Sequence, residues 1–310
     1  MPLLFGIFLI FIKRIKMKSD NPNPLSKLYR NKSVYVKLPS RGKYYPSGIE
    51  LSVDQELGVF PMTAKDELVL KTPDSLFNGD AIIQLFNSCA PDIKNPKEIP
   101  ACDVDHIILA IRAASEQYQD VSCSCPKCKK DNEFKIDILQ ILSISETNKT
   151  SNKIKVSDEV TVYVRPFTLE TQLKSNIQQF ETYRLQVMLN QDKDKYKQNE
   201  IEKMFSDAFK KIMDLTTEIL SDSILKVEMI NDDGEIIIVE NQEHLKEWTH
   251  NMTKEVYHLL VNRVKELSEP SVNNEINVDC QHCNHNFKTT MDMNPVSFFI
   301  QGQQVSTITN

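Results

Sequence analysis

The chain of 310 residues is 40% hydrophobic and 26% charged, with a formal net charge of −6. The hydrophobic fraction is sufficient for a buried core, and the acidic balance lacks the general basic character of a nucleic-acid-binding protein. Only 7 glycines occur, and neither G-x-x-x-x-G-K-[ST] nor G-x-G-x-x-G is found in the sequence, which argues against a nucleotide-binding enzyme.

Residues 1–32 combine an apolar start with a basic segment. The apolar run 1–12 is shorter than the ~20 residues of a membrane-spanning helix, and its basic residues follow it, whereas those of a secretory signal come first. We expect translation to begin at Met17, with 1–16 as an upstream extension; a short amphipathic anchor is the alternative. Ten lysines and arginines against one acid from Lys13 to Lys43 predict a disordered basic extension, or an arm that steers the chain to an acidic partner.

Residues 33–142 predict a mixed α+β region. A strand over 33–38 ends in a turn at Gly42, and a second strand leads into a helix that Thr63 caps, with Asp66 completing a capping box. Two more helices follow, and His106 and Arg112 on the second are expected to be satisfied or solvent-facing. Their apolar stripes are Ala81, Ile82, Leu85, Phe86 and Cys89 in the first helix, and Ile107, Ile108, Ile111 and Ala114 in the second.

Residues 143–270 predict an inserted, mostly helical α+β region. A polar linker over 143–153 precedes a strand of alternating valines, and helices follow from Leu169 and over 201–219. Two apolar runs around an Asp-Asp-Gly turn predict a hairpin. The segment 243–267 then predicts one long helix. Its three histidines lie six and eight residues apart, which excludes the H-x-x-x-H face of a metalloprotease helix.

Two distant segments repeat one pattern: SCSCPKCKKDNEFKIDI at 122–138 and INVDCQHCNHNFKTTMDM at 276–293. Each has a C-x-x-C, a polar turn, Phe-Lys and an extended segment. Two facing C-x-x-C turns supply the four thiolates of a tetrahedral structural zinc site, which leaves no open position for catalysis. We therefore expect one zinc per chain. The expected ligands are Cys125, Cys128, Cys280 and Cys283, with Cys123 and His285 as substitutes.

The separation of the two motifs is the objection to a shared site. Between Cys128 and Cys280 lie 151 residues, whereas the pairs of familiar zinc ribbons are about 15–20 apart. Loop-closure entropy grows only with the logarithm of length, so an inserted domain with neighbouring ends is compatible with one site. The alternatives are two unrelated turns with inert cysteines, or a C-x-x-C oxidoreductase. The latter requires a helix at the motif, whereas extended segments follow both motifs here.

Three segments resemble the baseplate protein family of T-even-type contractile-tailed bacteriophages: KLPSRGKYYP, FPMTAKDELVLKTPDSLFNGDAIIQLFNSCAPDI and CDVDHIILAIRAASEQYQDVSCSCPKC. The resemblance covers Leu38 to Cys128 well and the remainder loosely. It implies a non-enzymatic component of the baseplate hub, or a hub assembly factor, that contacts phage hub or tail proteins. It places the protein in the host cytoplasm during assembly and in the tail baseplate of the virion. No small-molecule substrate, nucleic acid or membrane is expected.

The fold class expected is therefore α+β, with a mainly helical body, short β-hairpins and a split zinc-ribbon-like site. This site is formed by the two C-x-x-C turns, the two knuckles. The expected divisions are 1–32, 33–142, 143–270 and 271–310, the last with the second knuckle and a C-terminal tail. A charged set, Arg41, Lys65, Asp66 and Glu67, is the candidate partner-binding surface, although Asp66 and Glu67 could equally stabilise a helix N-terminus.

Two other functions compete with this interpretation. A zinc-ribbon nucleic-acid-binding regulator is favoured by the knuckles and the basic arm, and is opposed by the net charge. An enzyme requires a nucleophile–base pair, a carboxylate pair or an open metal site, and the sequence shows no such motif.

Overall fold

The computed structural model describes residues 23–71, 79–144, 150–191, 198–231, 233–270, 272 and 275–291. The chain divides into two compact units, 1–31 and 32–310. The described part of the first unit contains a 3-10 helix, η1 Pro24–Leu28, which begins where the Asn23 side chain accepts a hydrogen bond from the Leu25 N–H. The expected start at Met17 lies outside the described residues. No described helix has the length and apolar character needed to span a bilayer.

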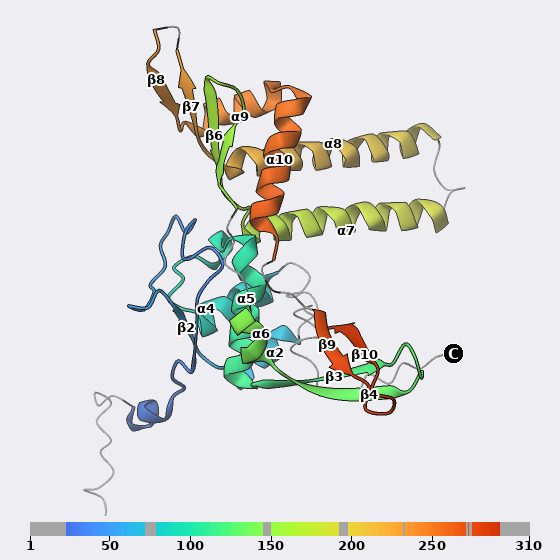
Figure 1. Ribbon diagram of the computed structural model, residues 1–310. Helices are drawn as coiled ribbons and strands as arrows, with labels where there is room; N and C mark the ends of the chain where they lie inside the picture. Colours follow the sequence, from blue (N-terminus) through green and yellow to red (C-terminus); the bar gives the residue numbers. More distant parts are fainter. Residues whose placement is uncertain are drawn as a thin grey trace, which may run out of the picture. The chain divides into compact units, whose positions relative to one another are not determined.

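The larger unit contains two hydrophobic clusters, and the first is centred on helix α5 Ala101–Ser115 (Figure 1). This helix packs against the two-stranded sheet β1–β2 and against α6. The other elements of this part of the chain are β1 Val34–Val36, β2 Leu57–Val59, α2 Ala64–Leu70, α4 Asp80–Cys89, η2 Pro96–Glu98 and α6 Ile138–Ile144.

Helix α5 is buried on almost every side. Ile107, Ile108 and Ile111 lie in the core as their spacing predicts. His106 and Arg112 are also buried, so of the two expected alternatives, satisfied or solvent-facing, burial excludes the solvent-facing one for both. Arg112 pairs with Glu116 one turn later. Burial lowers the pKa of His106 to about 4, so this imidazole is neutral near pH 7.

Asp103 on α5 anchors the turn that follows β1. Its carboxylate accepts hydrogen bonds from the Ser40 N–H at 2.8 Å, from the Ser40 hydroxyl and from the Tyr45 hydroxyl at 2.8 Å. Burial raises the pKa of Asp103, and the hydrogen bonds from Ser40 and Tyr45 oppose that rise. Gly42, at φ +71°, completes the turn in a conformation that side-chain-bearing residues rarely adopt. The Leu-Pro-Ser-Arg-Gly segment is therefore tied to the core through one carboxylate.

The start of α2 confirms the predicted capping box. The Thr63 side chain accepts from the Asp66 N–H, and the Asp66 carboxylate accepts from the Thr63 N–H at 2.7 Å. The start of α4 depends on Gly79, which has φ +80° and lies so close to helix α7 (Leu169–Gln191) that a Cβ there would overlap Leu173. Only glycine combines this backbone conformation with this approach.

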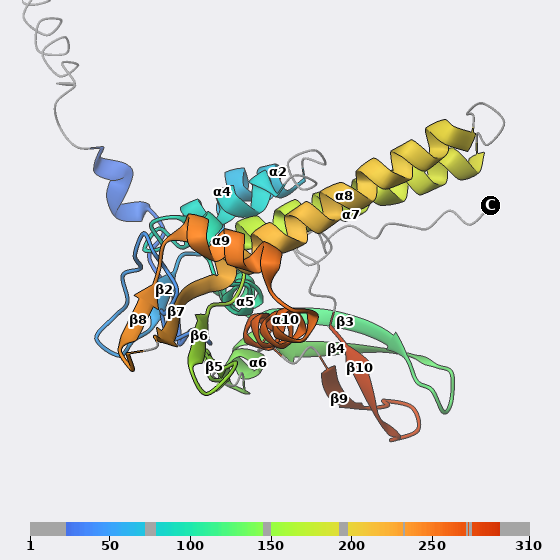
Figure 2. The ribbon, with the colours of Figure 1, turned by 90° about the horizontal axis from the view of Figure 1, so that it is seen from above.

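The second cluster lies between residues 153 and 268 and consists of side chains from a four-stranded antiparallel sheet and from helices α8, α9 and α10. The strand order is β5-β6-β7-β8, and α7 and α8 run side by side in Figures 1 and 2. β7 and β8 pair antiparallel as the predicted hairpin, with Gly234 in the connection. The elements are β5 Lys153–Lys155, β6 Val160–Val164, α7 Leu169–Gln191, α8 Gln198–Ser223, β7 Ile224–Ile230, β8 Ile236–Val239, α9 Gln242–Asn251 and α10 Lys254–Ser268.

The single long helix expected over 243–267 is wrong, because the chain breaks between α9 and α10. Met252 and Thr253 adopt extended backbone conformations with ψ 155° and 157°. The Thr253 side chain then accepts from the Val256 N–H and begins α10. A threonine cap inside an amphipathic segment favours two helices over one, because it satisfies an N–H group that a continuous helix would bond to the backbone.

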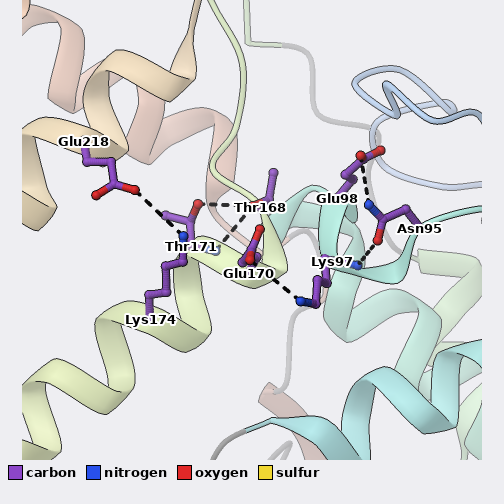
Figure 3. Close-up of polar contacts among 8 residues, drawn as sticks. All are labelled: Asn95, Lys97, Glu98, Thr168, Glu170, Thr171, Lys174 and Glu218. Carbon is purple, nitrogen blue, oxygen red and sulfur yellow. Dashed lines mark hydrogen bonds and ion pairs between the residues drawn. The ribbon is translucent and has the colours of Figure 1, made fainter. Parts of the chain in front are cut away.

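The beginning of α7 lies beside η2 of the first cluster (Figure 3). The Ala101 N–H donates to the Phe167 carbonyl at 2.9 Å and the Leu169 N–H to the Ile99 carbonyl at 2.8 Å. Nearby, Lys97 pairs with Glu170 at 3.9 Å. Exposed ion pairs of this kind contribute at most about 1 kcal/mol each, so the backbone bridge is the firmer connection between the two parts of the unit.

Replacing Asp103 with alanine should lower the free energy of unfolding by about 2–4 kcal/mol, because the Ser40 N–H and the Tyr45 hydroxyl would lose their buried acceptor. Urea unfolding followed by circular dichroism measures the change. Asp120→Ala on an exposed strand position is the matched control, with an expected change within about 0.5 kcal/mol. Equal losses in the two variants would contradict the anchoring role.

Candidate metal centre

The first C-x-x-C lies at the tip of a hairpin formed by β3 Tyr118–Ser124 and β4 Asp131–Asp137. The Cys125 N–H donates to the Lys130 carbonyl at 2.9 Å, and the Cys125 carbonyl accepts from the Lys129 N–H at 2.9 Å. Lys129 has φ +61°, in the left-handed region. These contacts close a tight turn that directs two cysteines to one side of the backbone.

The second C-x-x-C repeats this backbone geometry between β9 Glu275–Asp279 and β10 Asn286–Thr290. The Cys280 N–H donates to the His285 carbonyl at 3.0 Å, and the Cys280 carbonyl accepts from the Asn284 N–H at 2.9 Å. Asn284 has φ +53° and is the counterpart of Lys129. The repeated sequence pattern therefore encodes the same knuckle twice.

The two knuckles bring four sulfur atoms together. The Sγ atoms of Cys125 and Cys283 are 3.8 Å apart and those of Cys128 and Cys280 are 3.6 Å apart, and all four lie within 4.8 Å of one another. Tetrahedral Zn–S bonds of about 2.3 Å require sulfur–sulfur separations of about 3.8 Å. The donor set and its spacing thus fit a tetrahedral thiolate-bound metal ion, and the group could hold one.

The pKa values of the two thiols in the second knuckle are shifted in opposite directions, downward for Cys280 and upward for Cys283. Desolvation opposes ionisation of Cys280, but hydrogen bonds from the backbone N–H groups of His282 and Cys283 to its sulfur lower its pKa to about 6. The His285 N–H favours the Cys283 thiolate, yet burial and the adjacent cysteines raise the pKa of Cys283 to about 12. The four sulfurs are close enough that ionising one disfavours ionising the next, and a cation removes this conflict.

Asn132 connects the two knuckles, and the sequence analysis did not identify it. Its buried side chain donates to the Lys130 carbonyl at 2.9 Å and accepts from the Gln281 N–H at 2.8 Å. The Gln281 side chain donates in turn to the Glu133 carbonyl at 2.6 Å. An asparagine in the strand after a C-x-x-C turn gives no sequence signal for this role, because its second partner lies 149 residues away.

Core packing also holds the second knuckle against the first part of the chain. Met291 is 1% exposed and belongs to the first hydrophobic cluster, and Ile276 packs against that cluster. Near the two ends of the intervening region, the Arg263 side chain donates to the Ser151 carbonyl at 2.8 Å. The insertion itself, with its bounds, stays a prediction.

The other candidate residues take different positions. Cys123 belongs to β3, and the His285 ring stacks on Phe287 with centroids 6.4 Å apart; neither belongs to the four-sulfur group. In the charged set, the buried Asp66 carboxylate serves the capping box, which supports the helix-start alternative for this residue. Arg41, Lys65 and Glu67 are exposed. Their role as a partner-binding surface stays a prediction.

A family model described as T4 bacteriophage base plate protein matches residues 31–300 of the chain. The matched range includes both knuckles and the whole region between them. Neither the curated proteins nor the solved structures gave a significant match.

Replacing Asn132 with alanine should weaken metal binding about 10–100-fold, because hydrogen-bonded groups behind the ligands hold them in position. Competition with a chromophoric chelator measures the metal affinity. Glu133→Ala, an exposed neighbour whose carbonyl contact to Gln281 is unaffected by side-chain loss, is the control. If both variants retain the native affinity, Asn132 does not position the site.

Proposed function

Because the chain belongs to the T4 bacteriophage base plate protein family, we propose that it is a non-enzymatic component of the baseplate hub, or a hub assembly factor, that acts through protein–protein contacts. The observation that carries the proposal is the family match over residues 31–300. The assignment to the hub is more specific than the family match. It is supported by the resemblance of the segments between Leu38 and Cys128 to family members that are associated with the baseplate hub. The protein would act in the host cytoplasm during assembly and in the tail baseplate of the virion.

The proposal includes a structural zinc ion held by Cys125, Cys128, Cys280 and Cys283. Zinc is preferred because four cysteine ligands in tetrahedral geometry are typical of structural zinc sites. Such a site leaves no coordination position for water or substrate, which supports a role in stability rather than in catalysis. The ion would join the hairpin β3–β4 to the hairpin β9–β10 in a ribbon-like arrangement.

A zinc-ribbon nucleic-acid-binding regulator is the second candidate, because paired knuckles also occur in such proteins. The charges around the knuckles give it little support. Lys288 pairs with Glu275, and Lys135 lies over the Tyr118 ring. The remaining lysines are interspersed with acids, so they do not form the concentrated basic face that phosphate binding requires. The lysines are Lys127, Lys129 and Lys130, and the neighbouring acids are Asp131, Glu133, Asp137 and Asp279.

Elemental analysis of the purified protein should find about one zinc per chain, since the four cysteines make one tetrahedral site. Cys280→Ser should lose most of the zinc and unfold more readily, because metal binding contributes directly to folding free energy. Cys89→Ser and Cys102→Ser are the controls, since both cysteines lie in the core away from the four-sulfur group. Equal zinc loss in all three variants would exclude the assigned ligands.

Affinity purification of the chain from phage-infected cells should recover baseplate hub proteins, and the purified chain should not bind duplex DNA with submicromolar affinity at physiological salt. Nucleic-acid affinity arises mainly from phosphate neutralisation and falls steeply with salt, so a salt titration separates specific binding from background. Submicromolar DNA binding without recovery of any hub protein would favour the regulator instead.

A further inference from the structure

The open edge of strand β8 is a surface that the family match does not explain. β8 is the outermost strand of the sheet β5-β6-β7-β8 (Figure 1). Its sequence, Ile-Ile-Ile-Val, is a continuous hydrophobic run, which is typical of a strand covered on both faces. Yet Ile236, Ile237 and Ile238 are 68%, 42% and 53% exposed. An exposed apolar edge strand is a template for pairing with another chain.

The ladder with β7 shows which backbone groups face the open edge. The Asn231 N–H donates to the Glu235 carbonyl at 2.9 Å, so this pair is hydrogen-bonded. Hydrogen-bonded pairs alternate along an antiparallel ladder. Ile237 and Val239, opposite Met229 and Val227, therefore bond to β7. The N–H and C=O groups of Ile236 and Ile238 point to the open side, where an added strand can bond to them.

An apolar groove adjoins the same strand. Val227, Met229 and Val239 line one wall of a cavity of about 500 Å³, and Trp248 of α9 lines another. These three strand residues share one face of the sheet, because side chains alternate between faces. Alternate side chains of a strand added beside β8 would face this side of the sheet, so the groove favours apolar side chains there.

The charge around β8 defines the partner. From Val227 to Leu245 the sequence has six acidic residues and no lysine or arginine. Within the described part of the chain, the pair Lys226–Glu228 is the only ion pair that involves this segment. Glu235 and Glu240 flank the hydrophobic run on either side. A second copy of the chain would bring the same acidic hairpin against itself, which like-charge repulsion disfavours.

From these features we propose that β8 binds an extended segment of a partner protein as an added antiparallel strand, with alternating apolar residues between basic flanks. Main-chain hydrogen bonds to Ile236 and Ile238 would provide affinity, and Glu235 and Glu240 with the groove would provide selectivity. The proposal rests on the proposed function in one respect, because it takes the chain to act through protein–protein contacts.

The test uses the isolated full-length protein and two synthetic peptides, KVTVTVK and EVTVTVE, so that its outcome is separate from recovery of hub proteins. In ¹⁵N-labelled protein, KVTVTVK should shift the amide resonances of Ile236 and Ile238 saturably, and those of Ile237 and Val239 less. EVTVTVE should bind about fivefold more weakly, the effect of two exposed charge pairs. Absent shifts, or equal affinity for both peptides, would overturn the proposal.

Two variants complete the experiment. Ile238→Pro removes an N–H at the open edge and leaves the β7 ladder bonds in place, so it should abolish peptide binding with a preserved circular dichroism spectrum. Glu235→Lys with Glu240→Lys should reverse the preference in favour of EVTVTVE. Should sedimentation show a native dimer that Ile238→Pro converts to a monomer, the occupant is a second copy and the basic-partner assignment is wrong.

Discussion

The contact between the two cysteine knuckles is the constraint on which the larger unit depends. It joins Cys128 to Cys280 across 151 residues of chain. A metal ion bound by all four sulfurs would cross-link the chain over this span, and the loop-closure entropy removed from the unfolded chain would amount to about 5 kcal/mol in the chain-entropy model. That amount is comparable to the whole stability of many domains, so an ion at this site would determine whether the C-terminal hairpin stays attached. Met291 and Ile276 reinforce it by packing on the first cluster.

Backbone hydrogen bonds within each knuckle position its cysteines for this contact. In each, the first cysteine donates through its N–H and accepts through its carbonyl within one turn, and a left-handed residue follows. Asn284 tolerates that conformation better than Lys129 does. Asn132 then fixes one knuckle against the other through hydrogen bonds to both. The backbone of each knuckle thus orients its two sulfurs in the same direction. The buried side-chain amide of Asn132 fixes the position of one pair of sulfurs relative to the other.

What the sequence predicted correctly depends on short-range chemistry. The capping box of Thr63 and Asp66, the apolar stripe of α4 and the hairpin turn at Gly234 each involve neighbours within a few residues, so their patterns are visible in one window of sequence. The repeated C-x-x-C was visible at long range because cysteine pairs are rare and their chemistry is specific.

What the sequence could not predict depends on contacts made in three dimensions. The joining of β6 to β7 in one sheet pairs residues about 65 positions apart, and no pattern marks that pairing. Helix α5 shows an apolar stripe because its other faces carry polar residues, yet tertiary contacts bury Asp103, His106 and Arg112 as well. The break at Thr253 lay within an uninterrupted amphipathic pattern, where one side-chain cap decides between one helix and two.

The two parts of the larger unit both leave large apolar side chains exposed. In the first part these include Val53 at 98% and Leu68 at 68%, although α5 itself is enclosed. In the second part large apolar side chains stay exposed on α8 and β8, among them Phe209 at 65% and Ile236 at 68%. The net charge of −6 opposes association between copies of the chain through like-charge repulsion. It does not remove these apolar side chains from water. The large apolar side chains exposed on α8 and β8 are therefore surfaces that a partner protein would gain by burying.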